Sequence, residues 1–179
     1  MTDAAPAKAA RFHVWGPLSA LGLFVAVVAC LLDQATKWWL RDVFRLPRHI
    51  AEPVAPFVNL TLTWNTGISY GLFPQEGPLG AWALLAFKIA AVIFLWLWLA
   101  RAASRLTALA LGLIIGGAIG NAIDRLHWPG VMDFVDLHVG NLHWYVFNLA
   151  DVAIVAGVVA LLCESLLPGS AAKAPRSGI

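Results

Sequence analysis

Four long apolar segments limit the folds open to this chain of 179 residues more than any other feature does. They cover residues 18–40, 79–100, 106–123 and 152–167. A helix needs about 20 residues to cross a bilayer, within a range of roughly 17–25. The first and last segments reach that length only with the polar residues at their ends. The sequence therefore predicts four transmembrane helices.

The composition agrees with a membrane protein and excludes other classes. Hydrophobic residues make up 60% of the chain and charged residues only 12%, whereas about 25% of the residues of a soluble domain are charged. The formal net charge of +2 is small, and no basic patch is interleaved with aromatic residues. Nucleic acid is therefore not expected as a partner, and the length fits one domain.

Four spans place both termini on one side of the membrane. Six Lys and Arg residues fall on the side of the termini and five on the opposite side, which favours cytoplasmic termini. Most acidic residues fall on the other side, so we expect the chemistry there. The predicted organisation is a cytoplasmic tail (1–15), a four-helix domain (16–168) that includes an extracytoplasmic β-rich segment (43–76), and a second tail (169–179).

The two long connections carry different signals. Residues 57–64, FVNLTLTW, alternate in polarity and are rich in β-branched residues, which is typical of a strand with one buried face. We expect a small extracytoplasmic sheet between the first and second helices, lying on the membrane surface. Trp128, Trp144 and Tyr145 lie in the connection between the third and fourth helices, where they fit an interfacial aromatic belt. We read that connection as a periplasmic loop.

Glycines at four-residue spacing mark the third span: Gly112, Gly116 and Gly120. Such a ridge lets another helix approach closely. The partner helix could belong to the same chain or to a second copy. We expect a monomer.

Nine polar residues flank the apolar segments near the same predicted face: Asp33, Lys37, Asn65, Asn121, Asp124, Arg125, Asp133, Asn148 and Asp151. Several have ordinary structural explanations. Asp33 and Lys37 are four residues apart and can form an ion pair on a helix. Asp124 and Arg125 can form a local charge pair. Asn148 can cap the fourth helix, with Asp151 at the third helical position, where an acid suits the helix dipole.

A second interpretation pairs Asp151 with Asp133. The chain between them is long enough to leave the membrane and return. Two carboxylates held together do not both ionise readily, so one keeps its proton. The ionised group can act as a base on water while the protonated group polarises a carbonyl. This pair predicts peptide hydrolysis without a metal, thiol or serine.

Other constellations remain as alternatives. Ser69 with Lys88 or Lys37 could form a serine–lysine dyad, although no local motif supports it. A second set could bind a metal, although strand alternation explains its spacing more simply: His127, Asp136, His138 and His143. A proton-coupled carrier would also use membrane aspartates, but it usually has an internal repeat, and we find none.

Five motifs occur in order along the chain: DQATK at 33–37, NTGISYG at 65–71, GGAIGNAIDR at 116–125, VMDF at 131–134 and FNLAD at 147–151. Together they resemble the lipoprotein signal peptidases, the signal peptidase II family, over residues 18–167. The resemblance implies an aspartic endopeptidase of the bacterial inner membrane with its active site near the periplasmic face. It implies cleavage of a prolipoprotein before a diacylglyceryl-modified cysteine.

The resemblance also assigns roles to individual residues. It implies that Asp133 and Asp151 are catalytic, and that the other polar residues support the site: Asp33, Lys37, Asn65, Asn121, Asp124, Arg125 and Asn148. We expect Asn65 and Gly67 to lie where the sheet clamps the substrate, and Asn121, Asp124 and Arg125 to hold the loop that carries Asp133. No cofactor or metal is implied. Membrane lipids and globomycin-type inhibitors are the other expected partners. The second motif departs from the family pattern at residues 68–70, which bears on substrate or inhibitor contacts.

Overall fold

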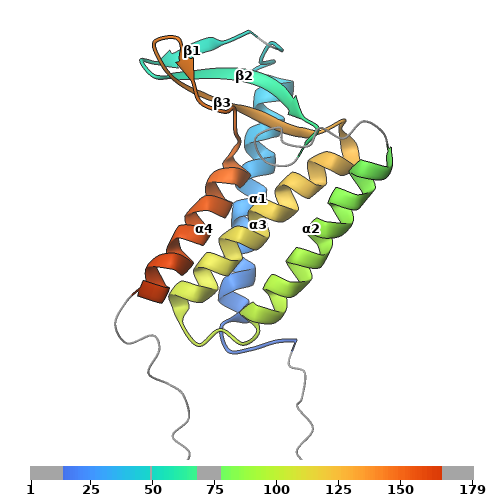
Figure 1. The fold of residues 1–179 in the computed structure, drawn as a ribbon, viewed down its shortest axis with the longest axis vertical. Helices are drawn as coiled ribbons and strands as arrows, with labels where there is room; N and C mark the ends of the chain where they lie inside the picture. The colour runs from blue at the N-terminus through green and yellow to red at the C-terminus, as the bar shows by residue number, and fades with distance from the viewer. Residues whose placement is uncertain (1–13, 49, 68–77, 167–179) are drawn as a thin grey trace, which may run out of the picture.

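The structure is a computed structural model that describes residues 14–48, 50–67 and 78–166. Four helices form a bundle, and a four-stranded sheet lies across one end of it (Figure 1). The elements are α1 (Ser19–Trp38), the π-helical turn η1 (Trp39–Val43), β1 (Glu52–Ala55), β2 (Val58–Asn65), α2 (Pro78–Leu99), α3 (Arg105–His127), β3 (Val131–Val139), β4 (Leu142–His143) and α4 (Leu149–Leu166). The predicted tails lie mostly outside the described residues, as do Ile68, Ser69 and Tyr70.

The helices match the predicted spans. Within the described residues, α1 with η1, α3 and α4 are long and apolar enough to cross a membrane, and α2 contributes a shorter apolar stretch, Ala86–Leu99. Large apolar side chains point outward from the bundle, including Phe24, Phe87 and Leu162. Such exposure is expected of helices that face lipid rather than water.

Helix α3 runs through the middle of the bundle and packs against α1, α2 and α4 (Figure 1). Its glycines make the approach close. A Cβ atom at Gly116 would collide with the backbone of Ala26 in α1, and one at Gly117 with the backbone of Ala150 in α4. The glycine ridge therefore packs within the chain.

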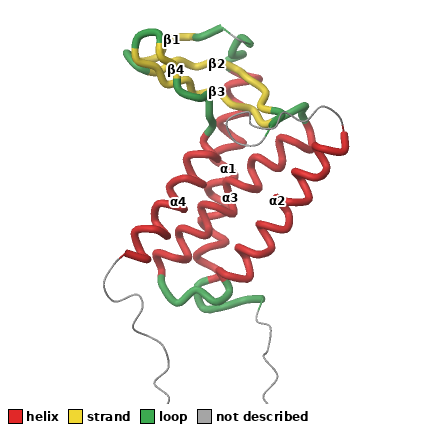
Figure 2. Tube along the Cα trace, in the orientation of Figure 1, coloured by secondary structure: helices red, strands yellow, loops and turns green. Residues whose placement is uncertain are grey.

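The sheet is antiparallel in the order β1-β2-β3-β4. All strands gather beyond one end of the helices (Figure 2). The predicted strand at 57–64 is β2. The connection between the third and fourth helices was predicted as a loop, but it supplies β3 and β4 of the same sheet. The reason is that VMDFVDLHV pairs with β2, with Thr63 opposite Asp133.

A small apolar core joins the sheet to the helices. It consists of Leu40, Leu46, Leu62, Met132 and Phe134. The widened turn η1 ends α1 here, and Leu46 N–H donates to the Leu40 carbonyl at 2.9 Å. This core fixes the height of the strands above the bundle.

Candidate active site

Backbone hydrogen bonds between β3 and Phe147, just before α4, bring the parts of the site together. The N–H groups of Phe134 and Val135 donate to the Phe147 carbonyl at 3.0 and 2.8 Å. Phe147 N–H donates back to the Val135 carbonyl at 3.0 Å. Strand β3 is thereby held against the start of α4. Asp133 of β3 and Asp151 of α4 come to lie on either side of one asparagine.

That asparagine, Asn148, contacts both aspartates. Its Nδ2 donates to Asp133 Oδ1 at 2.6 Å, and its Oδ1 accepts from Asp151 N–H at 3.0 Å. Asp151 Oδ2 in turn accepts from Asn148 N–H at 3.3 Å. The exchange between Asn148 and Asp151 is a capping box at the start of α4. The predicted N-cap is therefore confirmed, and the same residue also holds Asp133.

Asp133 is a buried carboxyl group outside the membrane-spanning segments, with 3% of its surface exposed. Its second oxygen, Oδ2, accepts from Asn65 Nδ2 at 3.1 Å. Burial, and after it the negative charge of Asp151, raises the pKa of Asp133 to about 7, against the opposing hydrogen bonds from Asn65 and Asn148. Asp133 is thus poised to hold a proton near neutral pH.

Asp151 is tied to α3 through its other oxygen. Asp151 Oδ1 accepts from Asn121 Nδ2 at 2.9 Å. Asn121 Oδ1 accepts from Asn148 Nδ2 at 3.1 Å and from Lys37 Nζ at 3.2 Å. Both asparagine side chains therefore have their orientation fixed by more than one bond. The two carboxylates are presented by a rigid polar network.

A buried ion cluster supports this network from α1. Lys37 Nζ lies 2.8 Å from Asp33 Oδ2 and 2.7 Å from Asp124 Oδ2. Asp33 Oδ1 accepts from Ala150 N–H at 3.0 Å, and Asp124 Oδ2 accepts from Met132 N–H at 3.0 Å. The cluster thus ties α1 to the first turn of α4 and to the start of β3. Buried charges of this kind need several partners to offset their desolvation.

Three predictions concern the residues of this cluster. The ion pair between Asp33 and Lys37 is confirmed. The local pair between Asp124 and Arg125 is wrong, because Asp124 turns inward to Lys37. Asp124 holds the strand that carries Asp133, as predicted, through Met132.

Arg125 has a different task from the predicted one. Its guanidinium donates to the carbonyls of Thr66, at 3.4 Å, and Gly67. Gly67 N–H donates to Asn65 Oδ1 at 3.1 Å. Arg125 therefore holds the turn after β2, and this turn orients the Asn65 amide toward Asp133. Asn121 likewise contacts Asp151 and Asn148 rather than the loop that carries Asp133.

Gln34 is a member of the site that sequence reasoning missed. Its Nε2 donates to Asp33 Oδ2 at 3.2 Å, to the Gly120 carbonyl at 3.0 Å and to Asp124 Oδ1 at 2.9 Å. It therefore bridges the two carboxylates that flank Lys37. The only signal in the sequence is its place within the DQATK motif.

The predicted metal-binding set does not come together among the described residues. Among the described residues no group of three or more His, Cys, Asp or Glu is arranged to hold a metal. Asp136 is occupied by His143 Nδ1 at 2.9 Å and Asn59 Nδ2 at 3.1 Å, while His127 Nδ1 bonds the Ile123 carbonyl at 2.9 Å. The serine–lysine alternative depends on Ser69, which lies outside the described residues.

The chain is similar to known proteins over most of its length. The family model described as signal peptidase (SPase) II matches residues 25–167. The lipoprotein signal peptidase of Rhodopseudomonas palustris (strain TIE-1) is 55% identical over 159 residues, which is 87% of this chain and 97% of that protein. The lipoprotein signal peptidase of Nitrobacter hamburgensis is 56% identical over 158 residues, covering 86% and 96%.

A solved structure shares the fold. It is described as a bacterial membrane enzyme determined by the in meso method, and it superposes with a TM-score of 0.67 at 24% identity, covering 89% of this chain and 95% of that chain. This likeness supports the arrangement of helices and sheet. Together with the family match and the relatives, it shows that the chain is a multi-pass bacterial membrane protein belonging to the signal peptidase II family of aspartic endopeptidases.

Proposed function

We propose that this signal peptidase cleaves prolipoproteins before a diacylglyceryl-modified cysteine, with Asp133 and Asp151 as its catalytic pair. The removal of signal peptides from prolipoproteins follows from the family. One observation supports the choice of residues. Asn148 bonds to both aspartates. One is Asp133, a buried carboxyl with a raised pKa, and the other is Asp151, at the N-terminus of α4.

The two aspartates take different roles in this proposal. Asp133 carries the proton, because burial disfavours its charged form. Asp151 takes the role of the base, because it accepts from Asn121 and from the Asn148 N–H at the start of α4, where the helix dipole favours a negative charge. An unequal pair of this kind can run acid and base steps together.

The reaction then follows the general course of aspartic peptidases. Asp151 removes a proton from a water molecule as the water oxygen bonds to the scissile carbonyl carbon. Asp133 gives its proton to the carbonyl oxygen. When the tetrahedral intermediate collapses, the C–N bond breaks, the leaving nitrogen receives the proton held by Asp151, and one of the two hydroxyl groups returns a proton to Asp133. Asn65, Asn121 and Asn148 keep the carboxyl groups in place throughout.

The membrane position of the site completes the proposal. Strand β3 and the start of α4, which carry the two aspartates, lie where the helices meet the sheet (Figure 1). We place this end at the periplasmic face of the inner membrane and both termini in the cytoplasm, on the basis of the distribution of Lys and Arg. A signal helix in the bilayer would then present its scissile bond to the dyad, and the sheet near Asn65 and Gly67 would cover it. Globomycin-type inhibitors would occupy the same place.

The test is a cleavage assay in detergent with a diacylglyceryl-modified prolipoprotein. We expect Asp133→Asn and Asp151→Asn each to abolish the mobility shift, because neither amide can exchange the required proton. Asp136→Asn is the matched control. Asp136 is also a buried carboxylate of β3, but its partners are His143 and Asn59. This variant should keep cleaving.

Folding of each variant is checked by its thermal unfolding curve. Cleavage near the wild-type rate by folded Asp133→Asn or Asp151→Asn would show that the dyad is assigned wrongly. Loss of cleavage in Asp136→Asn as well would point to a general effect of carboxylates in the sheet.

A further inference from the structure

Lys88 is a charged residue that the proposed reaction does not use. It is the single charged residue of α2, it is half-buried, and the surrounding helix is apolar. No hydrogen bond or ion pair joins its ammonium group to any other residue in the described part of the chain. A cation within a membrane helix is costly to keep, so an unpaired one calls for a functional explanation.

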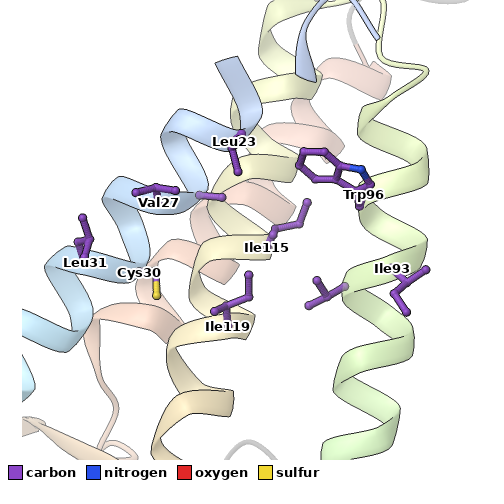
Figure 3. A pocket seen from close by; sticks show the side chains of 10 residues that line it. Leu23, Val27, Cys30, Leu31, Ile93, Trp96, Ile115 and Ile119 are labelled. Carbon is purple, nitrogen blue, oxygen red and sulfur yellow. The ribbon is translucent and has the colours of Figure 1, made fainter. Parts of the chain in front are cut away.

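The helical register places Lys88 on the inward face of α2. Val92 and Trp96 follow it at intervals of four residues, and both pack against the core formed with α1 and α3. The same two residues line an apolar cavity of about 390 Å³ between α1, α2 and α3 (Figure 3). Lys88 stands one helical turn above the α2 wall of this cavity, on the side of the sheet.

Lys88 also starts deeper in the bilayer than the dyad. It is the eleventh residue of α2, whereas Asp151 is the third residue of α4. Lys88 thus lies ten residues, or roughly 15 Å of helix, from the start of α2, and Asp151 lies two residues from the start of α4. The four-carbon stem of the side chain lets the ammonium group reach upward from there. Four charged residues act electrostatically on the ammonium group. In decreasing order of their effect they are Arg125, Asp151, Lys37 and Asp124.

None of these neighbours forms an ion pair with Lys88. Asp124 is paired with Lys37, and both oxygens of Asp151 accept hydrogen bonds from asparagines. Arg125 donates to backbone carbonyls and has no carboxylate partner among the described residues. Lys88 and Arg125 therefore each carry a positive charge that no carboxylate among the described residues contacts.

The reaction supplies the missing anion. Hydrolysis converts a neutral amide and water into a carboxylate and an ammonium group. The carboxylate forms at the end of the signal peptide, the part of the substrate that lies in the bilayer, where an unpaired charge is unfavourable. Resting on the function proposed above, we propose that Lys88 binds the carboxylate that cleavage leaves at the C-terminus of the signal peptide.

This role extends to the step before product formation. The two oxygens of that carboxylate are the carbonyl oxygen and the water oxygen of the tetrahedral intermediate. Positive charge held near them stabilises the negative charge that develops as the intermediate collapses toward the carboxylate. Lys88 thus marks the signal-peptide side of the scissile bond, and the lipidated cysteine lies on the other side of the dyad.

The test compares two synthetic signal peptides as inhibitors of prolipoprotein cleavage. One ends in a free carboxylate at the cleavage position and the other in a carboxamide. The wild-type enzyme should bind the acid more tightly than the amide by roughly ten- to hundredfold, the range expected for a charge-assisted hydrogen bond. Lys88→Met should remove this preference, and Lys88→Arg, which keeps the charge, should retain most of it.

The outcomes separate this inference from the proposed function. If the wild-type enzyme cleaves the prolipoprotein but binds acid and amide equally, the role of Lys88 is refuted and the dyad stands. A preference that survives in Lys88→Met would assign the carboxylate to Arg125 and also refute the proposal. If the wild-type enzyme does not cleave, the proposed function itself fails. The wild-type comparison requires no variant, so it remains decisive should Lys88→Met not fold.

Discussion

The side chain of Asn148 has two functions in this structure. Its Oδ1 closes the capping box of α4, while its Nδ2 holds Asp133. A side-chain amide can do both because it is a donor and an acceptor at once. The start of the helix and the position of the dyad are therefore fixed by the same group.

A substitution can separate these two tasks. Serine caps helices about as well as asparagine, but its single hydroxyl cannot bond Asp151 N–H and also reach Asp133 and Asn121. We expect Asn148→Ser to keep the capping contribution to stability and to lower kcat by about a hundredfold, the scale of a misplaced catalytic group. Asn148→Ala, which should also lose about 1 kcal/mol of capping free energy, is the comparison. Equal loss of stability in both variants would contradict the separation.

The raised pKa of Asp133 makes a prediction about pH. The catalytic form has a proton on Asp133, and its pKa is about 7. We therefore expect kcat/KM to fall as pH rises above about 7. Stability follows the same sign. Between pH 3.8 and about 7, Asp133 binds a proton in the folded protein that it has lost in the unfolded protein. The contribution of this proton to the free energy of unfolding is therefore complete below pH 3.8 and is lost as pH rises through 7.

The measurement is a pair of pH series. Thermal unfolding of the wild type and of Asp133→Asn between pH 5 and 8 isolates the contribution, because asparagine does not titrate. The wild-type melting temperature should decline across this range more than that of the variant. Parallel curves would show that Asp133 does not take up the proton.

At the scale of elements, α3 depends on close backbone contacts. Gly116 lies against the backbone of Ala26, so a methyl group there must push α1 away. We expect Gly116→Ala to lower the melting temperature and the cleavage rate together, because α1 carries Lys37 and Asp33. The cost of such overpacking is about 1–3 kcal/mol. Leu109→Ile, on the exposed side of α3, is the control and should change neither quantity.

The sequence predicts the helices of this fold better than its sheet. Apolar length alone locates α1, α2, α3 and α4 to within a few residues. The alternation of 57–64 reveals β2, because one face of that strand is buried. Strands β3 and β4 escape such reasoning, since Trp128, Trp144 and Tyr145 suggest an interfacial loop equally well. Pairing of β3 with β2 depends on a tertiary contact that no local pattern encodes.

The site shows the same limit. Spacing alone predicts the ion pair of Asp33 and Lys37 and the cap formed by Asn148, because both are local. The union of Asp133 with Asp151 is suggested by the chemistry of two carboxylates, and the backbone bonds to Phe147 make it possible. Arg125 acts through the backbone carbonyls of Thr66 and Gly67, and one of the three bonds of Gln34 goes to the backbone carbonyl of Gly120. A carbonyl is present at every residue, so the sequence gives no sign of which one is used.

At the scale of the whole molecule, the topology can be tested by labelling. The starting protein would lack both native cysteines, as Cys30→Ala with Cys163→Ala. A cysteine introduced by Leu142→Cys lies at the exposed first residue of β4. In spheroplasts we expect a membrane-impermeant maleimide to label it from outside. Ser104→Cys, in the connection before α3, should react only after the membrane is opened. The reverse pattern would invert the proposed orientation.

The glycine contacts of α3 have a consequence for how the enzyme meets membranes of different thickness. Gly112 and Gly116 abut the backbone of α1, and Gly117 that of α4. Contacts between backbones leave no long side chains to slide or repack, so the helices hold one vertical register. A thicker or thinner bilayer must then be met by tilting the bundle as a unit or by deforming the lipid. The dyad accordingly keeps a constant depth relative to its own helices, and the point at which a substrate is cut is set by the protein rather than by the lipid around it.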